Sequence, residues 1–120
     1  MNVDYLPGSQ DPSNSHWHAM SNGLINEDPK VAESKTNKYI DENLRACTLQ
    51  GLARAFHAEQ DKYSEAHSGY QPWYGGTPSL GHLWDDSGGA LGAPLRAATA
   101  ASITLFKRFK SLCPCMCKEQ

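Results

Sequence analysis

Apolar residues recur at helical spacing in three stretches of this chain. The dipeptide Asp28-Pro29 is a typical helix start, with Asp as the N-terminal cap and Pro at the first helical position. The three stretches predict helices over residues 29–46, 49–63 and 94–112. The residues that define their apolar sides are Ile40, Leu44 and Cys47, then Leu49, Leu52, Ala53 and Phe56, then Ala98, Ala101, Leu105, Phe109 and Leu112. No segment shows the alternation of a strand, so the pattern predicts an all-α fold.

The segments around these helices differ in composition. Residues 1–15 are rich in Pro, Gly, Ser, Asn and Asp and indicate a leader or linker. Residues 68–92 are rich in Gly and Pro and predict a long, ordered loop region. We therefore expect one compact helical domain over residues 16–112, between the leader and a Cys-rich tail at residues 113–120.

Size and charge narrow the class of protein. A chain of 120 residues fits one domain, and its 39% hydrophobic and 20% charged residues are ordinary for a globular protein. No apolar stretch approaches the roughly 20 residues that cross a bilayer, and the first residues do not resemble a secretory signal. The net charge of −2 suits a polyanion poorly, so nucleic acid is the less expected partner. Lys107, Arg108 and Lys110 could touch a membrane, although cations are common at a helix C-terminus.

The four cysteines are unevenly distributed. Cys47 is isolated, whereas Cys113, Cys115 and Cys117 lie within the last eight residues. This spacing is not that of a disulfide framework. The tail could bind a soft metal, accept a lipid or cross-link chains, but we expect it to be reduced and inert.

Histidines carry most of the candidate chemistry. His57 and Asp61 stand four residues apart on a predicted helix, so both project from one face, as ligands of one ion do. His82 and Asp86 repeat this spacing, and His67 lies between the two pairs. A single pair of this kind is usually a solvated polar face. The whole set instead predicts a metal centre.

His16 and His18 form a further pair. Residues two apart do not share a helix face, so at most one of them is expected to be a ligand unless the segment is extended. The sequence does not choose between them.

The run Ala55 to Gly69 resembles the zinc-dependent phospholipase C and S1/P1 nuclease superfamily, whose mark is His, three residues, Asp, five residues, His. His57, Asp61 and His67 match it, and His82 with Asp86 match a later pair of that family. The short gap between His67 and His82 resembles that of the phospholipase branch more than that of the nuclease branch. The resemblance implies an all-helical fold, a zinc cluster in a cleft between helices, an N-terminal His ligand, and Asp61 bridging two ions.

The chain also departs from this family. No His stands between His18 and His57, where family members carry an Asp and a His ligand. We therefore expect one or two zinc ions, and at most three. A further carboxylate ligand could come from Glu27, Asp28, Glu33, Asp41 or Glu42.

The stretch from His57 to Trp73 is similar to compact versions of this fold at the C-terminal tips of bacterial Rhs-type polymorphic toxins. That likeness implies an effector that a secretion machine delivers as part of a larger protein, which accounts for the lack of a signal peptide. A cognate immunity protein is then the expected partner.

The resulting hypothesis is hydrolysis of phosphate esters. His57 and Asp61 are the predicted catalytic residues: with an N-terminal His they would hold one zinc that activates water, while His67, His82 and Asp86 hold a second. Aromatic residues could line a cleft for acyl chains or a choline-like headgroup. They are Tyr63, Tyr70, Trp73 and Trp84. Phospholipid is the preferred substrate, and the alternatives are a nuclease of the same superfamily and a noncatalytic zinc-stabilised binding domain.

Overall fold

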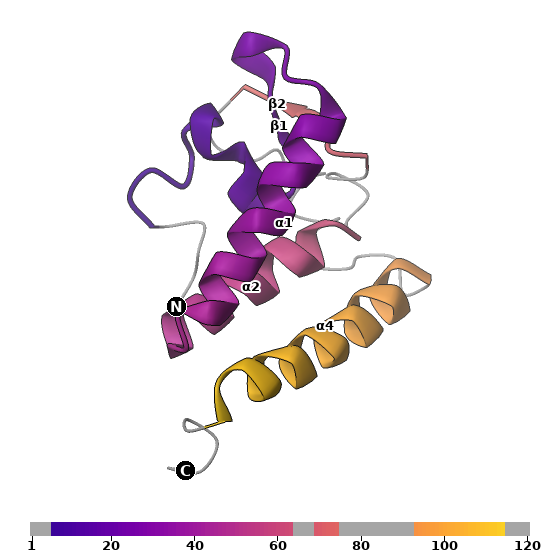
Figure 1. The fold of residues 1–120 in the computed structure, drawn as a ribbon. Coiled ribbons are helices and arrows are strands. Elements are labelled where there is room, and N and C mark those ends of the chain that lie inside the picture. The colour runs from indigo at the N-terminus through magenta and orange to yellow at the C-terminus, as the bar shows by residue number, and fades with distance from the viewer. Residues whose placement is uncertain (1–5, 64–68, 75–92, 115–120) are drawn as a thin grey trace.

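The computed structural model describes residues 6–63, 69–74 and 93–114. Its described part is mainly helical, with α1 at Pro29–Arg45, α2 at Leu49–Asp61 and α4 at Ala93–Leu112. Short 3-10 helices precede them, η2 at Pro12–His18 and η3 at Gly23–Ile25. In Figure 1, α4 lies alongside the pair that α1 and α2 form. The predicted all-α class and the three predicted helices are confirmed.

The ends of these helices follow local rules. The Asp28 side chain accepts a hydrogen bond from the Lys30 amide at 2.8 Å, which caps α1 as the sequence predicted. Thr48 caps α2 in the same way, because its Oγ1 accepts a hydrogen bond from the Gly51 amide at 2.9 Å. Between the two helices, Cys47 turns the chain with a φ of 53°.

Two very short strands also form, which the sequence did not predict. Strand β1, Ser21–Asn22, pairs in parallel with β2, Pro72–Trp73. Two residues are too few to show an alternating pattern, so only the pairing itself reveals them. The pair ties the segment of residues 69–74 to the chain that follows η2.

The hydrophobic core lies between α1, α2 and α4. Its members are Ile40, Leu44, Ala55, Ala58, Leu105, Phe109 and Cys113. The predicted apolar stripe of the last helix is confirmed, because Leu105 and Phe109 are buried at its centre. Burial of large apolar side chains from α1 and α4 stabilises this three-helix arrangement.

The buried side of α2 agrees only in part with the predicted one: Leu52 and Phe56 pack against the core while partly exposed. Leu49 is 64% exposed, and the side chains that α2 buries most deeply are small, Ala55 and Ala58. A Cβ added at Gly51 would lie 2.4 Å from the backbone oxygen of Asn43. The backbones of α1 and α2 approach so closely here that only small residues fit between them, which an analysis of apolar spacing does not detect.

We therefore expect Gly51→Ala to lower the free energy of unfolding by about 1–3 kcal/mol, since the new methyl group must push the helices apart. The sign is diagnostic, because Ala in place of Gly at an unhindered helical position stabilises by about 1 kcal/mol. Urea unfolding measures the change. The exposed neighbour Gln50, changed to Ala, is the control and should shift stability by less than about 0.5 kcal/mol. A Gly51→Ala protein more stable than the parent would contradict the close approach.

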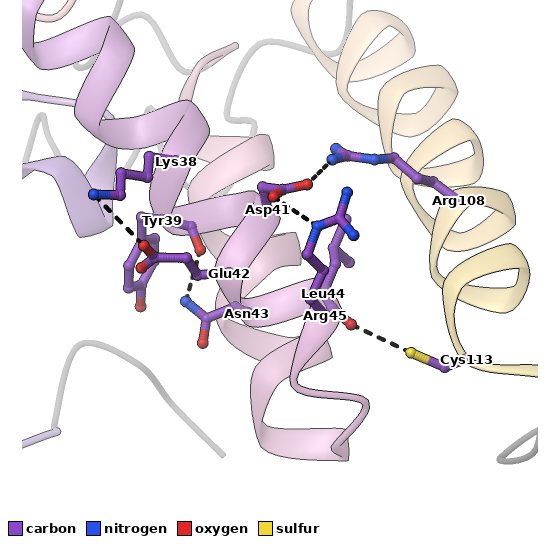
Figure 2. Close-up of polar contacts among 9 residues, drawn as sticks. All are labelled: Lys38, Tyr39, Asp41, Glu42, Asn43, Leu44, Arg45, Arg108 and Cys113. Atoms are coloured by element: carbon purple, nitrogen blue, oxygen red, sulfur yellow. Dashed lines mark hydrogen bonds and ion pairs between the residues drawn. The ribbon is translucent and has the colours of Figure 1, made fainter.

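Polar contacts join α4 to α1, and a disulfide joins the residue after α4 to the α1–α2 connection. Figure 2 shows Asp41 between Arg45, whose Nε donates at 2.8 Å, and Arg108 from α4. Further along, Cys113 is bonded to Cys47, and its sulfur lies 3.3 Å from the Leu44 carbonyl oxygen. The prediction of a reduced tail is thus wrong for Cys113. Cysteine spacing cannot reveal a pairing that depends on the end of α4 lying beside the α1–α2 connection. Cys115 and Cys117 lie outside the described residues.

Candidate metal centre

His57 and Asp61 stand one turn apart on α2, as predicted. His57 Nε2 lies 3.0 Å from Asp61 Oδ2. The Asp61 side chain is 9% exposed and that of His57 is 24% exposed. The pair therefore sits at the edge of the interior, with the imidazole partly open to solvent.

The N-terminal segment brings His18 to this pair. Asp11 caps η2, because its side chain accepts a hydrogen bond from the Ser13 amide at 2.9 Å, and Pro12 begins the turn. At the other end, Ala19 adopts a left-handed conformation with φ 54°, and its amide donates back to the η2 carbonyls. The chain reverses there, and His18, the last residue of η2, is buried.

Three donor atoms converge where η2 meets α2. His18 Nδ1 lies 3.2 Å from His57 Nε2 and 3.6 Å from Asp61 Oδ2. Two ligands bonded to one zinc ion at about 2.0–2.2 Å stand about 3.3 Å apart in a tetrahedron. With the 3.0 Å distance from His57 to Asp61, the three separations bracket that value. This group could hold a metal ion.

The second nitrogen of His18 is also engaged. His18 Nε2 lies 2.9 Å from the carbonyl oxygen of Ser9. A metal-binding His commonly donates its other N–H to a carbonyl or carboxylate, which fixes the orientation of the ring. No side chain in the sequence indicates this contact, because the carbonyl belongs to the backbone of the segment predicted to be a leader. Residues 6–15 contribute Ser9 and Ser15 to the buried interior.

His16 lies outside this group. Its ring centroid is 5.7 Å from that of Tyr39 in an edge-to-face contact, and Tyr39 stacks on Trp17 at 5.8 Å. The main chain of His16 is held as well, since its carbonyl accepts a hydrogen bond from Thr36 Oγ1. Burial, together with the charge of Lys35, lowers the pKa of the His16 imidazole. Of the two N-terminal histidines, the structure brings only His18 to the candidate site.

One of the predicted aromatic residues borders the centre. The Trp73 ring lies 5.3 Å from His18, edge to face, and is placed there by the pairing of β2 with β1. Tyr63 is exposed at the end of α2. Burial raises the pKa of Tyr70 to about 12, so its phenol keeps its proton at neutral pH. Of the predicted aromatic residues that the structure describes, Trp73 therefore makes the ring contact with the centre.

Three predicted ligands belong to other parts of the chain. They are His67, His82 and Asp86, which lie outside the described residues together with Trp84. Most of the carboxylates considered as further ligands have other contacts. Asp28 caps α1, Glu27 pairs with Lys35, Asp41 pairs with Arg45 and Arg108, and Glu42 pairs with Lys38. Within the described ranges, the group that could hold a metal ion is therefore His18, His57 and Asp61.

No protein-family model, curated protein or solved structure matches this chain.

Proposed function

We propose that this protein is a zinc-dependent phosphodiesterase of the phospholipase C type, with phospholipid as its substrate. The observation that carries the proposal is the convergence of His18 Nδ1, His57 Nε2 and Asp61 Oδ2. Two imidazole nitrogens and one carboxylate oxygen are a donor set that catalytic zinc sites use, and three protein ligands leave the fourth tetrahedral position to water or substrate. The partial exposure of His57 supports access to that position.

A zinc ion bound there would lower the pKa of a coordinated water and polarise a phosphoryl oxygen. The chain's own residues have separate tasks around it. His57 and Asp61, rigidly spaced on α2, set the position of the centre, and Asp61 offsets positive charge in a largely buried place. Trp73, beside His18, offers an aromatic wall to a substrate that enters from that side.

Phospholipid is favoured over nucleic acid by charge and surface composition. The chain has a net charge of −2, whereas nucleic-acid binding rests on an excess of cations. Outward positions of α4 expose Ile103 and Phe106 near Lys107 and Lys110. Apolar side chains beside cations suit the headgroup region of a bilayer. Among the described residues, no helix is both long and apolar enough to span one.

The likeness to Rhs-type toxin tips supports a further part of the proposal. We propose that the domain is an effector delivered as part of a larger protein, and that a cognate immunity protein binds the domain. Further zinc ligands would then come from His67, His82 and Asp86.

Vesicle hydrolysis tests the proposal. The purified chain, saturated with zinc, is mixed with vesicles of phosphatidylcholine or of phosphatidylethanolamine with phosphatidylglycerol. We expect release of phosphorylated headgroups, and Asp61→Asn should reduce it by at least about 100-fold, because a neutral amide is a poorer zinc ligand than a carboxylate.

Single-stranded DNA and RNA form the second arm of this experiment. Their cleavage, with vesicles left intact, would replace the lipid substrate by nucleic acid. Stoichiometric zinc without hydrolysis of any of these substrates would leave a zinc-stabilised binding domain and overturn the enzymatic proposal.

A further inference from the structure

The N-terminal segment folds back so that a main-chain carbonyl meets the candidate centre. The Ser9 amide donates to the Leu6 carbonyl at 3.0 Å, and the Asp11 amide donates to the Gly8 carbonyl at 3.1 Å. These turns bury Ser9, which is 1% exposed. Its carbonyl oxygen thereby comes within 2.9 Å of His18 Nε2.

This contact decides which nitrogen of His18 carries a proton. A carbonyl oxygen can only accept a hydrogen bond, so Nε2 must be the donor. In a neutral imidazole the other nitrogen, Nδ1, then holds the lone pair. Nδ1 is the atom that faces His57 Nε2 at 3.2 Å and Asp61 Oδ2 at 3.6 Å. A proton on His57 Nε2, or a cation bound among the three atoms, offsets the repulsion between the lone pair of His18 Nδ1 and the Asp61 carboxylate.

We propose that the Ser9 carbonyl is the positioning group of the metal centre: it holds His18 in the Nε2-protonated tautomer, so that His18 binds the ion through Nδ1 and His57 binds it through Nε2. The inference rests on the proposed metal site and adds the ligating atoms and their outer partner. It makes residues 6–18 part of the centre.

Two features hold the Ser9 carbonyl in place. Gly8 adopts φ 82°, a conformation that residues with a side chain rarely adopt. Asn14 Nδ2 donates to the Gly8 carbonyl at 3.0 Å, which ties the turn to η2. The Asn14 side chain therefore supports the Ser9 carbonyl through its hydrogen bond to Gly8 and not through a bond to a metal ligand.

Nitrogen NMR tests the proposal directly. In uniformly ¹⁵N-labelled protein titrated with Zn²⁺, long-range ¹H–¹⁵N spectra distinguish a protonated ring nitrogen from a metal-bound one. We expect His18 to show a protonated Nε2 and a zinc-shifted Nδ1, and His57 to show a zinc-shifted Nε2. A zinc-bound Nε2 on His18 would overturn the proposal, because the hydrogen bond to Ser9 could not then exist.

Asn14→Ala supplies the second measurement. The variant loses the bond that holds the turn, so we expect zinc affinity to fall by about tenfold, the lower end of the loss that outer partners of metal ligands cause. Asn43→Ala is the matched control. Asn43 Nδ2 also donates to a backbone carbonyl, that of Tyr39 at 2.8 Å, but within α1. Equal zinc affinity in the two variants would contradict the positioning role.

These measurements separate the inference from the proposed function. Zinc bound through His18 Nδ1 without hydrolysis of lipid or nucleic acid would support the inference and sink the enzymatic proposal. Hydrolysis with zinc at His18 Nε2 would support the enzymatic proposal and overturn the inference. If Zn²⁺ perturbs neither the His18 ring nor the His57 ring, the inference and the proposed function both fail.

Discussion

His57→Ala is expected to abolish zinc binding at the centre formed by His18, His57 and Asp61. The substitution removes one of three donor atoms that lie 3.0–3.6 Å from one another. Loss of an outer partner alone costs about 10–100-fold in metal affinity, so the loss of a direct ligand should cost more than about 100-fold. The variant should stay folded, because the His57 side chain is 24% exposed and outside the deepest core. Elemental analysis and Zn²⁺ titration followed by calorimetry give the measurement.

His16→Ala is the matched control for this prediction. It removes the same side chain from a position two residues before His18, where the ring packs on Tyr39 and lies outside the candidate centre. Zinc affinity should change by less than about threefold, while the lost ring contact lowers stability by about 1 kcal/mol. Equal zinc content in His57→Ala and the parent protein would refute the centre as described. If His16→Ala loses more zinc affinity than His57→Ala, then His16, and not His18, is the N-terminal ligand of the centre.

Removal of the Cys47–Cys113 disulfide should destabilise the fold by about 4 kcal/mol. The bond joins residues 66 apart in the sequence, and closing a loop of that length restricts the unfolded chain by about this free energy. The Cα atoms lie 5.5 Å apart, within the usual range for a disulfide. The bond also anchors the end of α4, which contributes Leu105 and Phe109 to the core. A loss of this size is a large share of the stability of a domain of this length.

Urea unfolding of the parent protein with and without a dithiol reductant measures this effect. The double variant Cys47→Ser with Cys113→Ser should match the reduced parent and should not respond to the reductant. An unfolding midpoint that reduction leaves unchanged would show that the bond contributes no stability. Zinc affinity should remain near that of the parent at low urea, because α4 supplies none of the three donor atoms.

Local sequence rules predicted the helices and one pair of site residues. Asp28 and Pro29 define the start of α1 because a side-chain oxygen and a fixed φ act within one turn of the chain. His57 and Asp61 share a face because residues four apart on any α-helix do so. Such features depend on backbone geometry over a few residues. They can therefore be predicted from the sequence before the packing of the helices is known.

Tertiary structure decided how these elements are used. The choice of His18 over His16 depends on where η2 meets α2, and His18 reaches His57 across 39 residues of chain. The close approach at Gly51 lies on the side of α2 that buries the small residues Ala55 and Ala58 most deeply, and the docking of α4 brought Cys113 to Cys47. The Ser9 carbonyl has no side-chain signature at all, since every residue carries the same group. The sequence determined which local elements form and which side chains share a helix face, whereas contacts between distant segments, set by packing of the whole chain, decided which atoms meet.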